Sequence, residues 1–98
     1  MSMISETVLQ KATPLMWNTC TIQGKDLAHC LWLCVQEGEN RFYISARIDG
    51  EETILAVGGE LSAATELFLR IQRGGVTPCC MADVIEDYWF EKSKISVQ

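Results

Sequence analysis

Residues 74–90 are GGVTPCCMADVIEDYWF, and this stretch predicts the end of one helix, a tight turn and a second helix. Thr77 is a residue type that caps helix N-termini, and Pro78 follows it at the first helical position, where no backbone N–H is needed. At the helical period, one half of the second helix is apolar and the other half is mainly acidic. Such a helix closes a core on one side, so the rest of the chain must supply the surface that it covers.

A first helix is predicted just before this stretch, over about 62–73, and the second helix over about 78–90. Ser62 is a suitable N-cap for the first helix, and Gly74 is placed to end it in the left-handed conformation. The first helix has an apolar stripe that needs a partner surface. The stripe consists of Leu61, Ala64, Leu67, Phe68 and Ile71.

Four strands are predicted before the helices, because the apolar period changes to two from Leu15 onward. They cover about 15–23, 28–37, 40–48 and 51–57. The turns between them are predicted at Gly24-Lys25-Asp26, Gly38-Glu39 and Asp49-Gly50, the last being typical of a type I′ hairpin.

Tight hairpins at these turns predict which residues lie opposite one another. Ile22 should lie opposite His29, Val35 opposite Phe42, and Ala46 opposite Thr53. With this register, one sheet face is apolar, with members such as Leu31, Leu33, Phe42, Ile44 and Leu55.

The fold class that follows is α+β. A four-stranded antiparallel meander is covered on one face by two C-terminal helices, which makes a two-layer sandwich. Residues 15–90 form this single domain, 1–14 are expected to be an irregular N-terminal segment, and 91–98 a flexible tail.

The order of four strands and two helices, with VTP at 76–78 followed by MADVIEDY at 81–88, resembles a family of small uncharacterised bacterial domains from Firmicutes. The resemblance covers roughly residues 28–90 and is sharpest in the last helix. It implies the same architecture, and no activity comes with it.

Composition excludes several classes of function. The formal net charge is −5, and the eight lysines and arginines are scattered, so no basic face for nucleic acid or for an anionic membrane can be assembled. The N-terminus has neither the cationic start nor the apolar stretch of a secretory signal. Five cysteines at irregular spacings are a poor disulfide framework, which favours a reducing cytoplasm.

Candidate chemistry in the sequence is sparse. Cys30, Cys34 and His29 cannot close a metal site, because the histidine points to the opposite face of its strand. Cys79 lies near the start of the second helix, where the helix dipole lowers thiol pKa values, and is the one candidate for a reactive thiol. No cofactor, metal ion or catalytic residue is predicted, and the sequence favours a role other than that of an enzyme.

The sheet face away from the helices carries more aromatic side chains than a bare solvent-facing sheet. Two explanations remain open: a partner covers this face, or residues 1–14 fold back over it with Ile4, Val8 and Leu9. The candidate interface or ligand residues on this face are Trp17, Trp32, Tyr43, Arg47 and Glu52.

The leading hypothesis is a cytoplasmic, non-enzymatic protein-association module that forms a homodimer through its outer sheet face or an edge strand. The alternative is a small-ligand-binding domain, in which Arg47 fixes an anionic group beside Trp32 and Tyr43. No nucleic-acid or membrane partner is expected.

Overall fold

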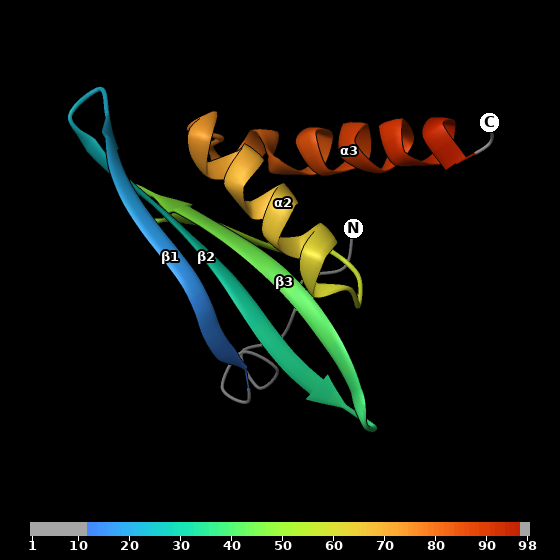
Figure 1. Cartoon of the computed structure of the whole chain (residues 1–98). Coiled ribbons are helices and arrows are strands. Elements are labelled where there is room, and N and C mark those ends of the chain that lie inside the picture. Colours follow the sequence, from blue (N-terminus) through green and yellow to red (C-terminus); the bar gives the residue numbers. More distant parts are fainter. Residues whose placement is uncertain (1–11, 97–98) are drawn as a thin grey trace.

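The computed structural model describes residues 12–96. The strands form one antiparallel sheet in the order β1-β2-β3-β4, and both long helices lie on the same face of it (Figure 1). The chain is therefore an α+β two-layer sandwich, as predicted. The elements are β1 (Thr13–Ile22), β2 (Lys25–Gln36), β3 (Glu39–Ile48), β4 (Glu51–Ala56), α2 (Leu61–Arg73), the short 3₁₀ helix η1 (Pro78–Cys80) and α3 (Met81–Ser96).

Two predicted boundaries at the ends of the chain are wrong. β1 begins at Thr13, so Thr13 and Pro14 belong to the sheet and not to an irregular N-terminal segment. α3 continues to Ser96, so most of the expected tail at 91–98 is helical. The helix continues because residues 91–94 contain good helix formers and no glycine or proline. The remainder of both predicted segments, 1–11 and 97–98, lies outside the described residues.

All three hairpins turn through the same kind of two-residue loop. The loops are Gln23-Gly24, Glu37-Gly38 and Asp49-Gly50, and φ is positive at both positions of each. This is the type I′ conformation, whose twist matches that of the flanking strands. The prediction for Asp49-Gly50 is correct, whereas the first two turns lie earlier in the chain than predicted.

The displaced turns change the pairing register but not the faces. Leu33 lies opposite Phe42, where Val35 was expected, and Ile22 lies opposite Lys25, where His29 was expected. Because both displacements are an even number of residues, every strand residue keeps its predicted face. One irregularity lies between Pro14 and Met16, where Leu15 is left without a register partner as a β-bulge.

The two ends of α2 are built differently from the prediction. The N-cap is Glu60, whose carbonyl accepts the first helical bond, so Ser62 is not the N-cap. At the other end Gly74 keeps right-handed dihedral angles, and Gly75, with φ of 58°, takes the left-handed position. The N–H of Gly75 donates to the Gln72 carbonyl and that of Val76 to the Ile71 carbonyl. These two bonds form a Schellman motif.

The second helix starts where the sequence predicts, but with a short 3₁₀ turn. Thr77 is the N-cap of η1 and Pro78 its first residue, as expected. The Thr77 side chain makes no capping bond.

The core lies between the helices and the inner face of the sheet. Four predicted stripe residues of α2 are buried, whereas Leu61 is 56% exposed. α3 contributes through its first turns only, and the rest of this helix extends past the sheet (Figure 1). The buried cluster comprises Leu31, Phe42, Ile44, Ala46, Val57, Ala64, Leu67, Phe68, Ile71, Met81, Ile85 and Tyr88.

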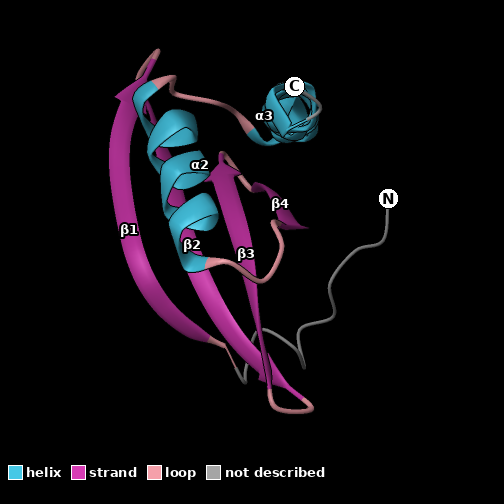
Figure 2. Ribbon diagram, turned by 45° about the vertical axis from the view of Figure 1, so that its right-hand side comes forward, coloured by secondary structure: helices cyan, strands magenta, loops and turns pink. Residues whose placement is uncertain are grey.

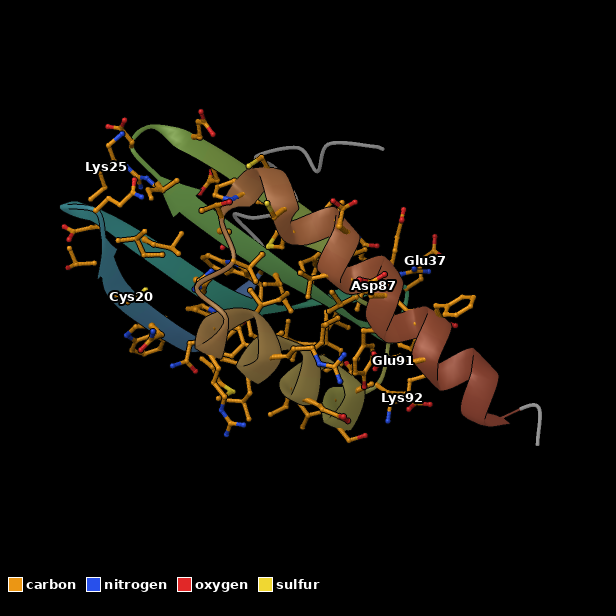
Figure 3. All side chains as sticks on the ribbon, turned by 90° about the horizontal axis from the view of Figure 1, so that it is seen from above. Cys20, Lys25, Glu37, Asp87, Glu91 and Lys92 are labelled. Carbon is orange, nitrogen blue, oxygen red and sulfur yellow. The ribbon has the colours of Figure 1, made fainter. Side chains whose placement is uncertain are left out.

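The contact between α2 and α3 is centred on Tyr88, which is fully buried. Its hydroxyl donates to Glu66 over 3.2 Å, and the Arg70 guanidinium lies 5.2 Å from the ring centroid. Burial raises the pKa of the Tyr88 hydroxyl, and the Glu66 carboxylate raises it further. Two ion pairs extend this contact by one turn of α3 (Figure 3). Glu91 pairs with Arg70 over 3.0 Å, and Lys92 pairs with Glu66 over 3.5 Å.

Candidate functional site: the outer sheet face and the β1 edge

The face of the sheet that is turned away from the helices is called the outer face here. The register places Trp17, Cys30, Ser45 and Ile54 in one row across the four strands, which fixes this face. Its members are Pro14, Trp17, Thr19 and Thr21 from β1; Asp26, Ala28, Cys30, Trp32, Cys34 and Gln36 from β2; Glu39, Arg41, Tyr43, Ser45 and Arg47 from β3; and Glu52, Ile54 and Ala56 from β4.

The three predicted aromatic residues all lie on the outer face, but they differ in exposure. Trp32 and Tyr43 are register partners on β2 and β3. Tyr43 is 7% exposed and Trp32 is half-buried, whereas Trp17 on β1 is 73% exposed. The indole N–H of Trp32 donates to the Ser45 hydroxyl over 3.0 Å, which fixes the direction of the ring.

One region of the outer face is buried although no helix lies over it. Cys34 is 2% exposed, and Tyr43 and Ser45 are each 7% exposed. Burial also raises the pKa of the nearby Cys30 thiol from 9.0 to about 11. Cys34 and Ser45 were not among the predicted site residues, because small residues next to aromatic ones give no sequence signal of burial.

The predicted charged residues lie at the other end of the outer face. Arg47 and Glu52 are opposite one another in the register, as expected, and both are exposed. In the described part of the chain their charged groups make no ion pair. Four residues along a strand separate Arg47 from Tyr43, about 13 Å of extended chain.

A shallow hollow of about 480 Å³ lies at this charged end, beside Arg47 and the Lys25–Asp49 ion pair of 2.9 Å. Figure 3 shows Lys25 at the end of the sheet opposite to Glu37. None of the described residues that line the hollow is aromatic, so Arg47 does not share it with Trp32 or Tyr43. The ligand-binding alternative, with rings and guanidinium on one small molecule, stays a prediction.

The edge strand β1 is a feature that the side-chain pattern did not reveal. Among the described strands, β1 and β4 each have a neighbour on one side only, so one row of backbone N–H and C=O groups faces away from the sheet. Natural sheets protect such edges by short strands, charges, proline or bulges. β4 has this protection, since it has six residues and begins with Glu51 and Glu52. β1 has ten residues, and its proline and its bulge both lie at its beginning. Residues 16–22 of β1 carry no charge.

His29 is fully buried on the inner face of the sheet. Its Nε2–H donates to the Val76 carbonyl over 2.7 Å, while Nδ1 has no hydrogen-bond partner among the described residues. This bond joins β2 to the link between α2 and η1. The role is structural, as the core-facing position predicts.

Cys79 is exposed, as a reactive thiol needs to be. Its sulfur lies 3.4 Å from the Thr77 hydroxyl oxygen and 3.9 Å from the sulfur of Cys80, which is also exposed. Among the described residues, its sulfur makes no hydrogen bond to a charged side chain. The reactivity of Cys79 stays a prediction.

Within residues 12–96, no three histidine, cysteine or acidic side chains come together as ligands for one metal ion. The described helices include none that is long and apolar enough to cross a membrane. Comparison with protein-family models, with curated proteins and with solved structures gave no match. The resemblance to the Firmicutes domains therefore stays a prediction.

Proposed function

We propose that the domain is a non-enzymatic, cytoplasmic protein-association module, and that its partner is a second copy of the same chain. The two copies pair through the free edges of their β1 strands, which makes one continuous sheet. The observation that carries this proposal is the contrast between the two edges: β4 is short and acidic, whereas residues 16–22 of β1 have none of the features that protect an edge.

The side chains of β1 support pairing. Threonine and tryptophan favour strands, and Trp17, Thr19 and Thr21 are all exposed on the outer face. Across a new strand pair, an aromatic residue gains contacts with the residues opposite and diagonal to it. Pairing thus covers part of the Trp17 ring, which is 73% exposed in the single chain.

A second copy is the partner that this edge fits best. Antiparallel pairing of one strand with itself has two-fold symmetry, so the same surface serves both chains and the assembly closes at two. The protected β4 edge stops the sheet from growing at its other side. The assembly is therefore a dimer and not a fibre.

The test uses matched lysine substitutions on the two edge strands, Trp17→Lys on β1 and Ala56→Lys on β4. Both residues are exposed on the outer face. Analytical ultracentrifugation is expected to show a dimer for the unchanged chain and for A56K, and a monomer for W17K. Because Trp17 is exposed, W17K should keep the stability of the fold within about 0.5 kcal/mol.

Two results would contradict the proposal. One is an unchanged chain that sediments as a monomer at the highest concentration reached. The other is a dimer that survives W17K and is lost in A56K, which would place the interface at β4.

A further inference from the structure

β1 and β4 form the two edges of the described sheet (Figure 2), and the first hairpin determines which backbone groups β1 presents at its edge. The two-residue type I′ loop makes Ile22 and Lys25 a hydrogen-bonded pair. Along an antiparallel ladder such pairs alternate with non-hydrogen-bonded pairs, whose N–H and C=O groups point away from the partner strand. In the uncharged stretch 16–22, the residues whose backbone groups point away from β2 are therefore Trp17, Thr19 and Thr21.

The same alternation explains the bonds at the other side of the sheet. The second hairpin closes at the pair Gln36 and Glu39, so the backbone groups of Phe42 must point away from β2. The Phe42 N–H donates to the Gly58 carbonyl over 2.8 Å, and the Phe42 carbonyl accepts from the Val57 N–H over 2.8 Å. Counting from a two-residue loop thus gives the correct direction of the backbone groups in this sheet.

The three outward residues of β1 restrict how two copies can pair. Antiparallel pairing of a strand with itself has a two-fold axis, and the residue at the axis lies opposite its own copy. With the axis at Thr19, Trp17 lies opposite Thr21 of the second copy, so all three outward residues of each chain form hydrogen-bonded pairs. Any other axis leaves at least one of the three without a partner in the stretch 16–22.

The side chains on the outer face agree with an axis at Thr19. Trp17 then has Thr21 of the second copy opposite it, which joins an aromatic to a β-branched side chain. The two copies of Thr19 lie opposite one another. Both kinds of cross-strand pair stabilise antiparallel sheets.

The inner face agrees as well, because the same axis places Met16 opposite Ile22 of the second copy. Both side chains are apolar and half-buried. Met16 packs against the core, and Ile22 lies next to Gly75 in the link between α2 and η1. The pair therefore extends the apolar layer from one copy to the other.

We propose that two copies of the chain pair about a two-fold axis at Thr19, with Trp17 opposite Thr21 and Met16 opposite Ile22 across the interface. This inference rests on the proposed dimer and fixes its register. Because the two-fold axis of an antiparallel pair is perpendicular to the sheet, both helical layers lie on the same side of the joined sheet.

Single cysteines at three successive positions of β1 distinguish the possible axes. Each test chain carries one cysteine only, introduced by Asn18→Cys, introduced by Thr19→Cys, or kept as the natural Cys20. The Cα atoms of a residue and its own copy are about 4.5–5.5 Å apart at the axis, which a disulfide spans. One residue away from the axis they are diagonal neighbours about 7–8 Å apart, which a disulfide does not span. In all test chains the remaining natural cysteines are replaced by serine or alanine, and these cysteines are Cys20 (where it is not the test residue), Cys30, Cys34, Cys79 and Cys80.

The chains are oxidised with diamide at a concentration at which sedimentation shows a dimer. T19C is expected to cross-link roughly tenfold faster or more than N18C and than the chain with Cys20 alone, because its thiols are held together in the dimer. Ala56→Cys on the β4 edge measures the rate of random collision and should be as slow as these two. Adding W17K to the T19C chain should abolish the fast cross-linking.

A second measurement does not depend on a substitution at the axis. In the proposed register Asn18 lies opposite Cys20 of the second copy. A mixture of the N18C chain with the chain that keeps only Cys20 should therefore cross-link, although neither chain does so alone.

The possible failures separate this inference from the proposed function. Fastest cross-linking of N18C, or of the chain with Cys20 alone, would move the axis by one residue and overturn the register while the dimer through β1 stands. Three equal rates in a chain that sediments as a dimer would also overturn the register. An unchanged chain that sediments as a monomer would refute the dimer, and the register with it.

Discussion

At the scale of single residues, His29 shows how a polar side chain is accommodated in the core. The ring is fully buried, and it satisfies a backbone carbonyl in the link between the helices. The carbonyl accepts, so Nε2 carries a proton, and Nδ1 has no hydrogen-bond partner among the described residues. A buried carbonyl without a donor costs more than the net value of the bond, and His29 therefore holds the helical layer to the sheet.

Replacing this donor is expected to destabilise the fold. His29→Leu removes the N–H and leaves the Val76 carbonyl unpaired, so the free energy of unfolding in urea should fall by about 1–3 kcal/mol. His29→Gln keeps an amide donor on a side chain of similar reach and should lose less. Equal stability of His29→Leu and the unchanged chain would show that the bond contributes nothing.

The Cys30 thiol gives a prediction about pH. Its pKa is raised from 9.0 to about 11 by burial. Only the thiolate is alkylated, and a shift of this size lowers the thiolate fraction at pH 8 about a hundredfold. In a chain whose only cysteine is Cys30, the alkylation rate should keep rising until the pH approaches 11. The same chain unfolded in urea is the control, and its rate should level off near pH 9.

The same shift has a consequence for stability. Because the folded state holds the Cys30 proton more tightly than the unfolded chain, the contribution is complete below about pH 9 and is lost as the pH rises toward 11. A folded chain whose alkylation levels off at the same pH as the unfolded one would contradict both statements.

At the scale of elements, the hairpins show what side-chain pattern determines and what it does not. Alternation fixes the face of each strand residue, and all these faces are predicted correctly. The register depends on which two residues take positive φ, and composition marks this clearly only for Asp49-Gly50. Gln23 and Glu37 are unusual residues for the left-handed conformation, so the two turns that they begin were predicted too late in the chain.

This unusual choice of residue leaves room for stabilisation. Glu37 has φ of 52°, and asparagine tolerates that region better than glutamate. Glu37→Asn should raise the free energy of unfolding by roughly 0.5 kcal/mol in urea denaturation. Gly38→Ala is the opposite control: a Cβ there meets nothing within 4 Å, so its loss of about 1 kcal/mol is due to φ of 79° alone. A destabilised Glu37→Asn would mean that the side chain has another role.

At the C-terminal end of α2, two adjacent glycines differ in how well they should tolerate alanine. Gly75 has φ of 58°, and an added Cβ would stand 3.1 Å from Cδ1 of Ile22, whereas Gly74 is in the right-handed region. Gly75→Ala is therefore expected to cost roughly 1–2 kcal/mol of unfolding free energy, and Gly74→Ala clearly less. The reverse order in thermal or urea unfolding would contradict the Schellman assignment.

At the scale of the whole molecule, the layer arrangement follows from the sequence while the candidate site follows only in part. Apolar stripes on two helices and one apolar sheet face leave a single economical packing, and the structure has it. The outer face was predicted from its aromatic residues, yet their differing exposure was not. Trp17 lies on the edge strand β1, whereas Trp32 and Tyr43 lie on the central strands β2 and β3. An edge strand was named as a possible dimer surface, but which edge was not predicted, because the free edge consists of backbone groups, which every strand has.

Hydrogen exchange of the backbone amides tests both the packing of the two layers and the pairing of the β1 edge. The amides of β2 and β3 have strands on both sides and should exchange most slowly, whereas α3 beyond Tyr88 has no buried residue up to Lys92 and should exchange fast.

If β1 pairs with a second copy, its outward amides are bonded in the dimer and free in the monomer. Their protection should then fall on dilution, while that of β4, the other edge, stays constant. If the protection of the β1 amides does not depend on concentration, any dimer that sedimentation detects does not form through the β1 edge.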